Sequence, residues 1–165
     1  MLVPAILYKE EIHNLFSAYY YSDDMVFYSG WLGSELPSIS NEPDGNNYQF
    51  AIIDDDNKLI GYFTYHIDWY ASSASRFGLF TFHRNNKIVG LDIWRELRKI
   101  INVYKIHRIE WRMVGGNPVE KHYDKFCKRY NGRKFVLTDA LKDRKGNYHN
   151  DVIYEIIFDS GENND

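Results

Sequence analysis

The sequence has few of the features that indicate disulfides, metal sites or membrane spans. Its single cysteine, Cys127, cannot form an internal disulfide, and no CxxC pair or Cys/His cluster has the spacing of a metal site. The first residues carry no basic leader, and their apolar run is too short for a signal sequence or a membrane helix. We therefore expect a cytoplasmic protein of a reducing compartment, with no bound metal and no membrane partner.

The chain also lacks the basic excess that is typical of nucleic-acid-binding proteins, because its formal net charge is −3. It has no RNA-binding motif, and we expect no nucleic-acid partner. The charge is nevertheless uneven: residues 1–83 have eleven acidic and three basic side chains, whereas residues 84–134 have fourteen basic and five acidic. A basic half suits a phosphorylated cofactor and an acidic half a cationic acceptor, although two solvated faces of opposite sign would give the same counts.

Hydrophobic periodicity predicts a single domain over residues 1–159 and a polar tail over 160–165. The expected elements are a strand at 5–8, helices at 10–20 and 22–28, strands at 48–54, 58–70 and 77–82, a helix at 91–104, a strand at 106–114, a helix at 118–130, and strands at 134–138 and 151–158. A binding loop is expected at 29–47, where Gly, Ser, Pro and Asn are frequent. The order predicts an α/β fold with a mixed, mostly antiparallel sheet of about seven strands, flanked by about four helices.

The stretch from Phe77 to Tyr104 is the centre of this arrangement. Its β-rich run leads through a polar loop at 84–90 into a helix whose apolar face is predicted from residues three or four apart. That face consists of Leu91, Trp94, Leu97, Ile101 and Tyr104. A short loop before a helix leaves backbone N–H groups unpaired at the positive end of the helix dipole, so this turn is predicted to bind a phosphate.

A second helix start follows the strand at 106–114. Asn117 is a good cap, Pro118 suits the first helical position, and Glu120 lies three residues after the cap. The apolar face of this helix carries Tyr123 and Cys127, and Cys127 is predicted to be a buried thiol with no catalytic role.

The order of elements and these two motifs resemble the GNAT N-acetyltransferase superfamily over nearly the whole chain. In that family the fourth strand leads into a pyrophosphate-binding loop, [Q/R]-x-x-G-x-[G/A], which opens the third helix. Here the loop begins at Arg84 and places Lys87 and Val89 at the glycine positions, with Gly90 just beyond. The family also has an Asn that opens the helix after the fifth strand and a Tyr about two turns later, to which Asn117 and Tyr123 are similar, with a spacing one residue shorter than usual.

The resemblance implies transfer of an acetyl group from acetyl-CoA to a primary amine by direct attack. The residues that it implies for acetyl-CoA are the strand amides of Phe80, Thr81 and Phe82, the loop of Arg84, Asn85, Asn86, Lys87, Ile88, Val89 and Gly90, and Asn117. Tyr123 is the candidate acid that protonates the leaving thiolate. Glu110 and His66, with Asp68 as a further candidate, could take the proton of the amine directly or through water.

Each of these residues also has a structural interpretation. Asn117 could be only a helix cap, Tyr123 a core aromatic residue, and the base candidates ordinary strand residues. The alternative function is a GNAT-like module without catalysis, which binds CoA or a protein partner. The acceptor is expected to be a small-molecule or peptide amine, cationic if the acidic half and the aromatic loop contact it, and a homodimer through a sheet edge is one expected assembly.

Overall fold

A computed structural model describes residues 1–19, 22, 27, 36–82 and 87–158 of the chain, which form one seven-stranded sheet. The elements are β1 (Leu2–Pro4), the 3-10 helix η1 (Ala5–Tyr8), α1 (Lys9–Tyr19), β2 (Asn47–Ile53), β3 (Leu59–Asp68), β4 (Ser73–Thr81), α3 (Lys87–Asn102), β5 (Arg108–Val114), α4 (Glu120–Arg129), β6 (Arg133–Lys142) and β7 (Tyr148–Ile157). The strand order is β1-β2-β3-β4-β5-β7-β6, with β4 and β5 parallel and the other neighbours antiparallel. The predicted fold class is thus confirmed.

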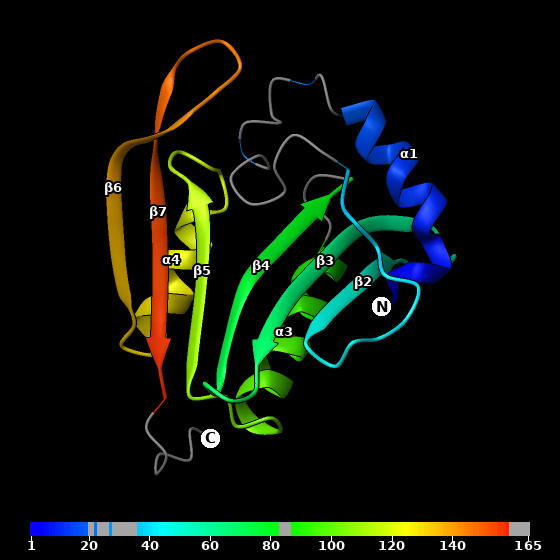
Figure 1. Cartoon of the computed structure of the whole chain (residues 1–165), viewed down its shortest axis with the longest axis horizontal. Helices are drawn as coiled ribbons and strands as arrows, with labels where there is room; N and C mark the ends of the chain where they lie inside the picture. The colour runs from blue at the N-terminus through cyan, green and yellow to red at the C-terminus, as the bar shows by residue number, and fades with distance from the viewer. Residues whose placement is uncertain (20–21, 23–26, 28–35, 83–86, 159–165) are drawn as a thin grey trace.

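The helices cover both faces of the sheet, as Figure 1 shows. On one face, α3 and α4 pack against alternate residues of the strands, including Phe63, Trp111 and Tyr154, in the larger apolar core. On the other face, Ile12 and Phe16 of α1 pack against Tyr62, Phe80 and Phe82 in a smaller core, which covers only β2 to β4. We call these the α3/α4 face and the α1 face.

Several element boundaries differ from the sequence prediction. Residues 5–8 form a 3-10 turn and not a strand, and the first strand lies just before them. The helix α4 begins at Glu120, two residues later than predicted, because Asn117 and Pro118 lie in a preceding turn. The predicted helix at 22–28 and most of the binding loop lie outside the described residues. Three α-helices are present in the described part of the chain.

The buried face of α3 agrees with the predicted one only in part, because Ile101 lies in the larger core and Leu97 and Tyr104 pack against it. Leu91 is 58% exposed, whereas Asp92 and Glu96 are buried. Both carboxylates have partners, which reduces the cost of burying their charge. The hydroxyl of Tyr65 donates to Glu96 Oε1 at 2.6 Å, and Arg95 lies 3.2 Å from Asp92 Oδ1. Burial raises the pKa of Tyr65, and the hydrogen bond to Glu96 raises it further, so this phenol stays neutral.

Gly61 lies where two strands approach each other closely. A Cβ at this position would lie 2.8 Å from the carbonyl oxygen of Phe80, and the register between β2 and β3 shifts at the neighbouring residue. The hairpin of β2 and β3 and the passage from β4 through α3 to β5 are also as predicted. None of the helices in the described part of the chain has the length and apolarity that a membrane span requires.

Candidate functional site

The strands β4 and β5 separate from each other along most of their length. They pair only at their first residues, where Ser73 lies opposite Arg108 and Ala74 opposite Ile109. Beyond these two pairs the strands diverge toward their C-terminal ends, leaving a gap in the sheet ladder (Figure 1). Side chains of Phe77 and Trp111 lie at this place in the sheet.

The backbone of β4 offers hydrogen-bond donors to this gap. The amide of Phe82 donates to the carbonyl of Ile60 on β3 at 2.9 Å, so it is not free, contrary to the prediction. Successive amides of a strand point to opposite edges, and Phe80 therefore also faces β3, whereas Leu79 and Thr81 direct their N–H groups toward β5. Of the three predicted amides, Thr81 alone faces the gap.

A mostly apolar cavity of about 540 Å³ lies on the α3/α4 face of the gap. It is lined by Leu79 from β4, Ile93 and Leu97 from α3, and Val119, Tyr123 and Phe126 from or next to α4. Tyr123 is partly buried and packs edge-on against Trp111, with ring centroids 6.0 Å apart. The predicted acid thus borders a cavity that could hold a long, largely apolar ligand, which is the character of a pantetheine arm.

Trp111 has an unusual environment in this cavity wall. Its ring stacks on Tyr154 with centroids 5.0 Å apart, and its side chain is 7% exposed. The indole Nε1 is buried and has no hydrogen-bond partner among the described residues. A buried donor without an acceptor costs about 1–3 kcal/mol, and such atoms in native structures often indicate a missing partner. An amide or thioester carbonyl in the cavity would provide one.

The start of α3 lies at the edge of the apolar cavity. Arg84, Asn85 and Asn86 fall outside the described residues, and the helix begins at Lys87. The predicted loop residues that follow are Ile88, which is partly buried, Val89, which is buried in the larger core, and Gly90, which lines the cavity. A branched side chain at the helix N-terminus could block a ligand from the backbone amides. Val89 does not do so, because its side chain packs into the core.

Asn117 has a structural role in the turn before α4, but it is not the cap of that helix, whose N-cap position is Val119. Its side-chain Oδ1 accepts from the amide of Val119 at 3.1 Å, and Glu120 Oε2 accepts from the amide of Gly116 at 3.2 Å. These bonds fix the turn that precedes α4. Asn117 is not part of the cavity wall, although its neighbour Val119 is.

A second, more polar cavity of about 790 Å³ lies on the α1 face of the gap. Gln49, Tyr62, Thr64 and His66 line it from β2 and β3, and Arg76 and Glu110 from β4 and β5. Gln49 donates to the carbonyl of Ser38 at 2.6 Å and to the hydroxyl of Tyr62 at 3.1 Å, which holds the preceding segment against the cavity. Burial raises the pKa of Tyr62 to about 12, so it remains a neutral hydroxyl here.

Two of the three base candidates, His66 and Glu110, border this polar cavity, whereas Asp68 is exposed and does not line it. His66 Nδ1 lies 2.9 Å from Asn47 Oδ1, a carbonyl oxygen, so Nδ1 is the donor and Nε2 is left to accept a proton. Glu110 forms an ion pair with Arg108, which also contacts Glu155. The structure therefore brings His66 and Glu110 to one cavity and Tyr123 to the other.

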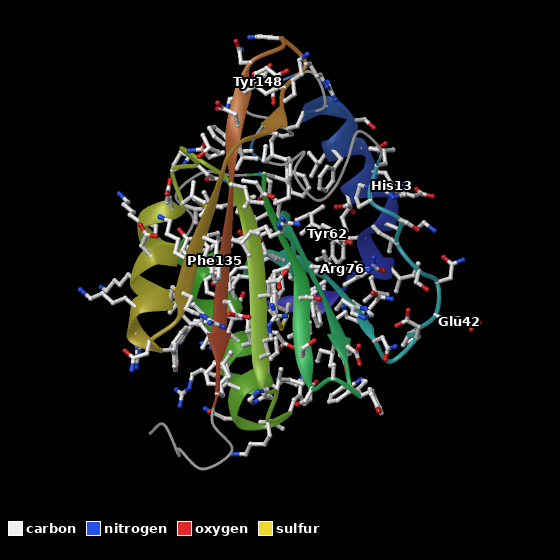
Figure 2. The ribbon with its side chains drawn as sticks, turned by 60° about the vertical axis from the view of Figure 1, so that its left-hand side comes forward. His13, Glu42, Tyr62, Arg76, Phe135 and Tyr148 are labelled. Carbon is white, nitrogen blue, oxygen red and sulfur yellow. The ribbon has the colours of Figure 1, made fainter. Side chains whose placement is uncertain are left out.

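The charge of the polar cavity is more basic than the sequence suggested. Arg112 forms an ion pair with Asp151 at 2.7 Å, whereas Arg76 has no ion pair or hydrogen bond within the described part of the chain. Arg76 lies at a register shift between β3 and β4 with φ of 53°, and it is labelled in Figure 2 with Tyr62. Three acidic residues of the N-terminal half, Asp23, Asp24 and Glu35, lie outside the described residues.

The two cavities meet at three residues that the sequence analysis did not select. Phe77, Trp111 and Arg112 line both cavities, at the gap between β4 and β5. Because side chains alternate along a strand, Trp111 and Arg112 of β5 point to opposite faces of the sheet. Where β5 separates from β4, each of them can therefore line a cavity on its own face. This alternation can be read from the sequence. The strand order is also needed, however, to identify Phe77, Trp111 and Arg112 as the boundary between two cavities.

The sequence matches no family model and no curated protein. Solved structures, however, have the same fold. A variant of the spermidine N-acetyltransferase of Vibrio cholerae is similar over 95% of this chain and 93% of that chain, with a TM-score of 0.67 and 19% identity. A dodecameric form of that enzyme is similar over 94% and 91%, with a TM-score of 0.67 and 19% identity. Its complex with manganese ions aligns over 69% of this chain and 66% of that chain, with a TM-score of 0.56 and 20% identity.

Proposed function

From the GNAT fold that this chain has, we propose that it is an acetyl-CoA-dependent N-acetyltransferase that acetylates a primary amine. The observation that carries the proposal is the meeting of two cavities, on opposite faces of the sheet, at Phe77, Trp111 and Arg112. A donor in the apolar cavity and an acceptor in the polar cavity would contact each other only there. Acetyl-CoA, when bound, supplies the acetyl group for direct attack by the amine.

The residues of the apolar cavity fit the donor. The amides of Leu79 and Thr81 would bind the pantetheine amides and polarise the thioester carbonyl. The N-terminus of α3, from Lys87 to Gly90, together with Arg84, Asn85 and Asn86, would hold the pyrophosphate. Tyr123, at the wall of the same cavity, would give its proton to the departing sulfur.

The polar cavity would hold the acceptor and receive its proton. His66 has Nε2 available, and Glu110 reaches the cavity from β5, next to the boundary with the donor. Either group could take the proton of the amine directly or through water. The ion pair with Arg108 holds the Glu110 carboxylate at this position on β5.

Two experiments test this proposal. Isothermal titration of acetyl-CoA into the full chain should give saturable heat at micromolar to millimolar ligand, and a panel of amines should include at least one that is turned over. The absence of heat at millimolar acetyl-CoA would contradict the proposal. Binding of acetyl-CoA or CoA without turnover of any amine would instead favour the binding module.

We further propose a cationic acceptor of the polyamine class. The acidic N-terminal half of the sequence supports this choice, and the enzyme of similar fold from Vibrio cholerae acts on spermidine by its name. Neutralising Asp23, Asp24 and Glu35 together tests it, because the rate with spermidine should fall. An unchanged rate would mean that these acidic residues give no support to a cationic acceptor.

Arg76 provides a second test of the acceptor. Its unpaired guanidinium repels a cation in the polar cavity, so Arg76→Gln should lower KM for spermidine about threefold, as expected for one partly screened charge. The measurement is steady-state kinetics at low salt, repeated at high salt, where the difference should shrink. A matched control is Arg98→Gln, at an exposed residue of α3 that lines neither cavity. A rise in KM for spermidine would contradict the repulsion between Arg76 and the acceptor.

A further inference from the structure

The turn that leads into β2 is built around the carboxylate of Asp44. Its Oδ1 accepts from the backbone amides of Asn46 at 2.9 Å and Asn47 at 2.6 Å, and its Oδ2 accepts from the side-chain amide of Asn47. The backbone and side-chain amides of Asn47, followed by the amide of Asn46, lower the pKa of Asp44. Asp44 is therefore an ionised carboxylate, which can only accept hydrogen bonds.

The neighbouring strand β3 holds this turn in place. The amide of Ile67 donates to the carbonyl of Asn46 at 2.8 Å, and the indole Nε1 of Trp69 donates to the carbonyl of Gly45 at 2.8 Å. Asn47, the first residue of β2, lies directly opposite His66 in the register of the two strands. Because directly opposite residues of an antiparallel pair have adjacent side chains, the turn delivers Asn47 to the imidazole.

Asp44 determines which way the side-chain amide of Asn47 faces. A carboxylate has no proton to donate, so the NH2 of Asn47 is bonded to Asp44 and its Oδ1 is turned to His66. That oxygen can only accept, so His66 Nδ1, which is 2.9 Å away, carries the ring proton. The lone pair of the neutral imidazole is then on Nε2, which has no hydrogen-bond partner within the described part of the chain.

We propose that Asp44 and Asn47 are positioning residues that hold His66 as the base for the acceptor amine. The inference rests on the proposed acetyltransferase function. His66 and Asn47 line the polar cavity, whereas Asp44 does not line it and acts through Asn47. Glu110, the other base candidate in this cavity, is ion-paired with Arg108, so the unpartnered Nε2 of His66 is the better proton acceptor.

The arrangement also suits the charge that forms on the imidazole. Nε2 takes one proton from the amine as the amine nitrogen bonds to the acetyl carbon and the bond from that carbon to sulfur breaks. Tyr123 protonates the sulfur, and the imidazolium of His66 returns its proton to solvent. Asp44 is close enough to His66 for its negative charge to attract the imidazolium.

The tautomer of His66 can be measured on the full chain without a substrate, from the ¹⁵N chemical shifts of the histidine rings. At about pH 8.5, where imidazoles are neutral, His66 should have a protonated Nδ1 and an unprotonated Nε2, with its signals assigned by their loss in His66→Gln. His13 is an internal reference of the opposite tautomer, because its Nε2 faces the carbonyl of Pro37 at 2.9 Å. A protonated Nε2 at His66 would overturn the inference.

Asp44→Asn tests the role of the carboxylate while keeping the turn. The new side chain retains an oxygen for the two backbone amides but places an NH2 against Asn47, which should then turn its own NH2 to His66. His66 should change to the tautomer with a protonated Nε2, and kcat should fall about tenfold, a part of the factor of about 100 or more that a general base contributes. Asp54→Asn is the matched control, because Asp54 Oδ1 also accepts from two backbone amides of a turn but does not line the cavity.

A second variant, Asn47→Ala, removes the link between Asp44 and His66 and should give a mixture of the two tautomers. An unchanged tautomer in both variants, or a changed tautomer with the wild-type kcat, would contradict the inference. Wild-type protein that turns over no amine would instead contradict the proposed function, and the ring ¹⁵N shifts would still decide whether Asp44 and Asn47 set the tautomer.

Discussion

Replacing Tyr123 by Phe is expected to lower kcat by about 100-fold or more, because general acid catalysis by a positioned side chain contributes about that factor. The substitution removes only the hydroxyl, so the ring keeps its edge-on contact with Trp111 in the wall of the apolar cavity. Affinity for acetyl-CoA, measured by titration, should change little. Steady-state kinetics at saturating acetyl-CoA gives the comparison.

Tyr130→Phe is the matched control for this experiment. Tyr130 lies at the end of the same helix and packs against Phe126 and Phe158, outside the cavity wall. Its loss of a hydroxyl should leave kcat within about twofold of wild type, as expected for a group remote from the chemistry. Equal effects of the two substitutions, or none from Tyr123→Phe, would exclude Tyr123 as the acid.

Trp111→Ala is expected to destabilise the protein by about 3–5 kcal/mol, which is the usual range for truncating a buried tryptophan. Trp111 is 7% exposed and contacts the rings of Tyr123, Phe126 and Tyr154, so its removal opens the core behind the gap. Urea unfolding measures the free-energy difference. Trp69→Ala, at a residue 46% exposed, should cost much less, and equal losses would contradict this account of the core.

Trp111→Phe separates the indole N–H from the packing of the ring. The smaller aromatic ring should keep most of the stability, and the buried Nε1 without a partner disappears. If that N–H donates to acetyl-CoA, the affinity measured by titration should fall several-fold. An unchanged affinity would show that the indole N–H makes no bond to acetyl-CoA and only lowers the stability of the core.

The sequence predicted best where periodicity and turn chemistry agree. The hairpin of β2 and β3 could be predicted from the alternating apolar residues on both sides of Asn57, a turn residue with φ of 60°. The passage from β4 through α3 to β5 could be predicted because the spacing of apolar residues changes from that of a strand to that of a helix. Amphipathicity misled the prediction for α3. A face chosen from large apolar residues included Leu91, but the helix buries Glu96 instead, because Tyr65 from β3 gives that carboxylate a partner.

The candidate site was less predictable because it depends on relations between strands. Whether an amide faces a neighbour or a gap depends on register, and the bond from Phe82 to Ile60 could not be derived from either residue alone. Asn117 shows a different limit, since its side chain accepts a hydrogen bond in the turn before α4, and an Asn that caps a helix, fixes a turn or binds a ligand has the same sequence signature. Tyr123 could be selected from its spacing, but only the position of α4 brings it to a cavity.

The brief contact between β4 and β5 has a mechanical consequence. The sheet consists of two parts, the strands from β1 to β4 and the strands β5, β7 and β6. Two residue pairs join these parts at one end, and the larger core under α3 also connects them. Bending about that fastened end changes the width of the passage between the cavities without separating any other pair of strands. The sheet would therefore bend most easily at these two pairs, which are also the ones that hold its two parts together.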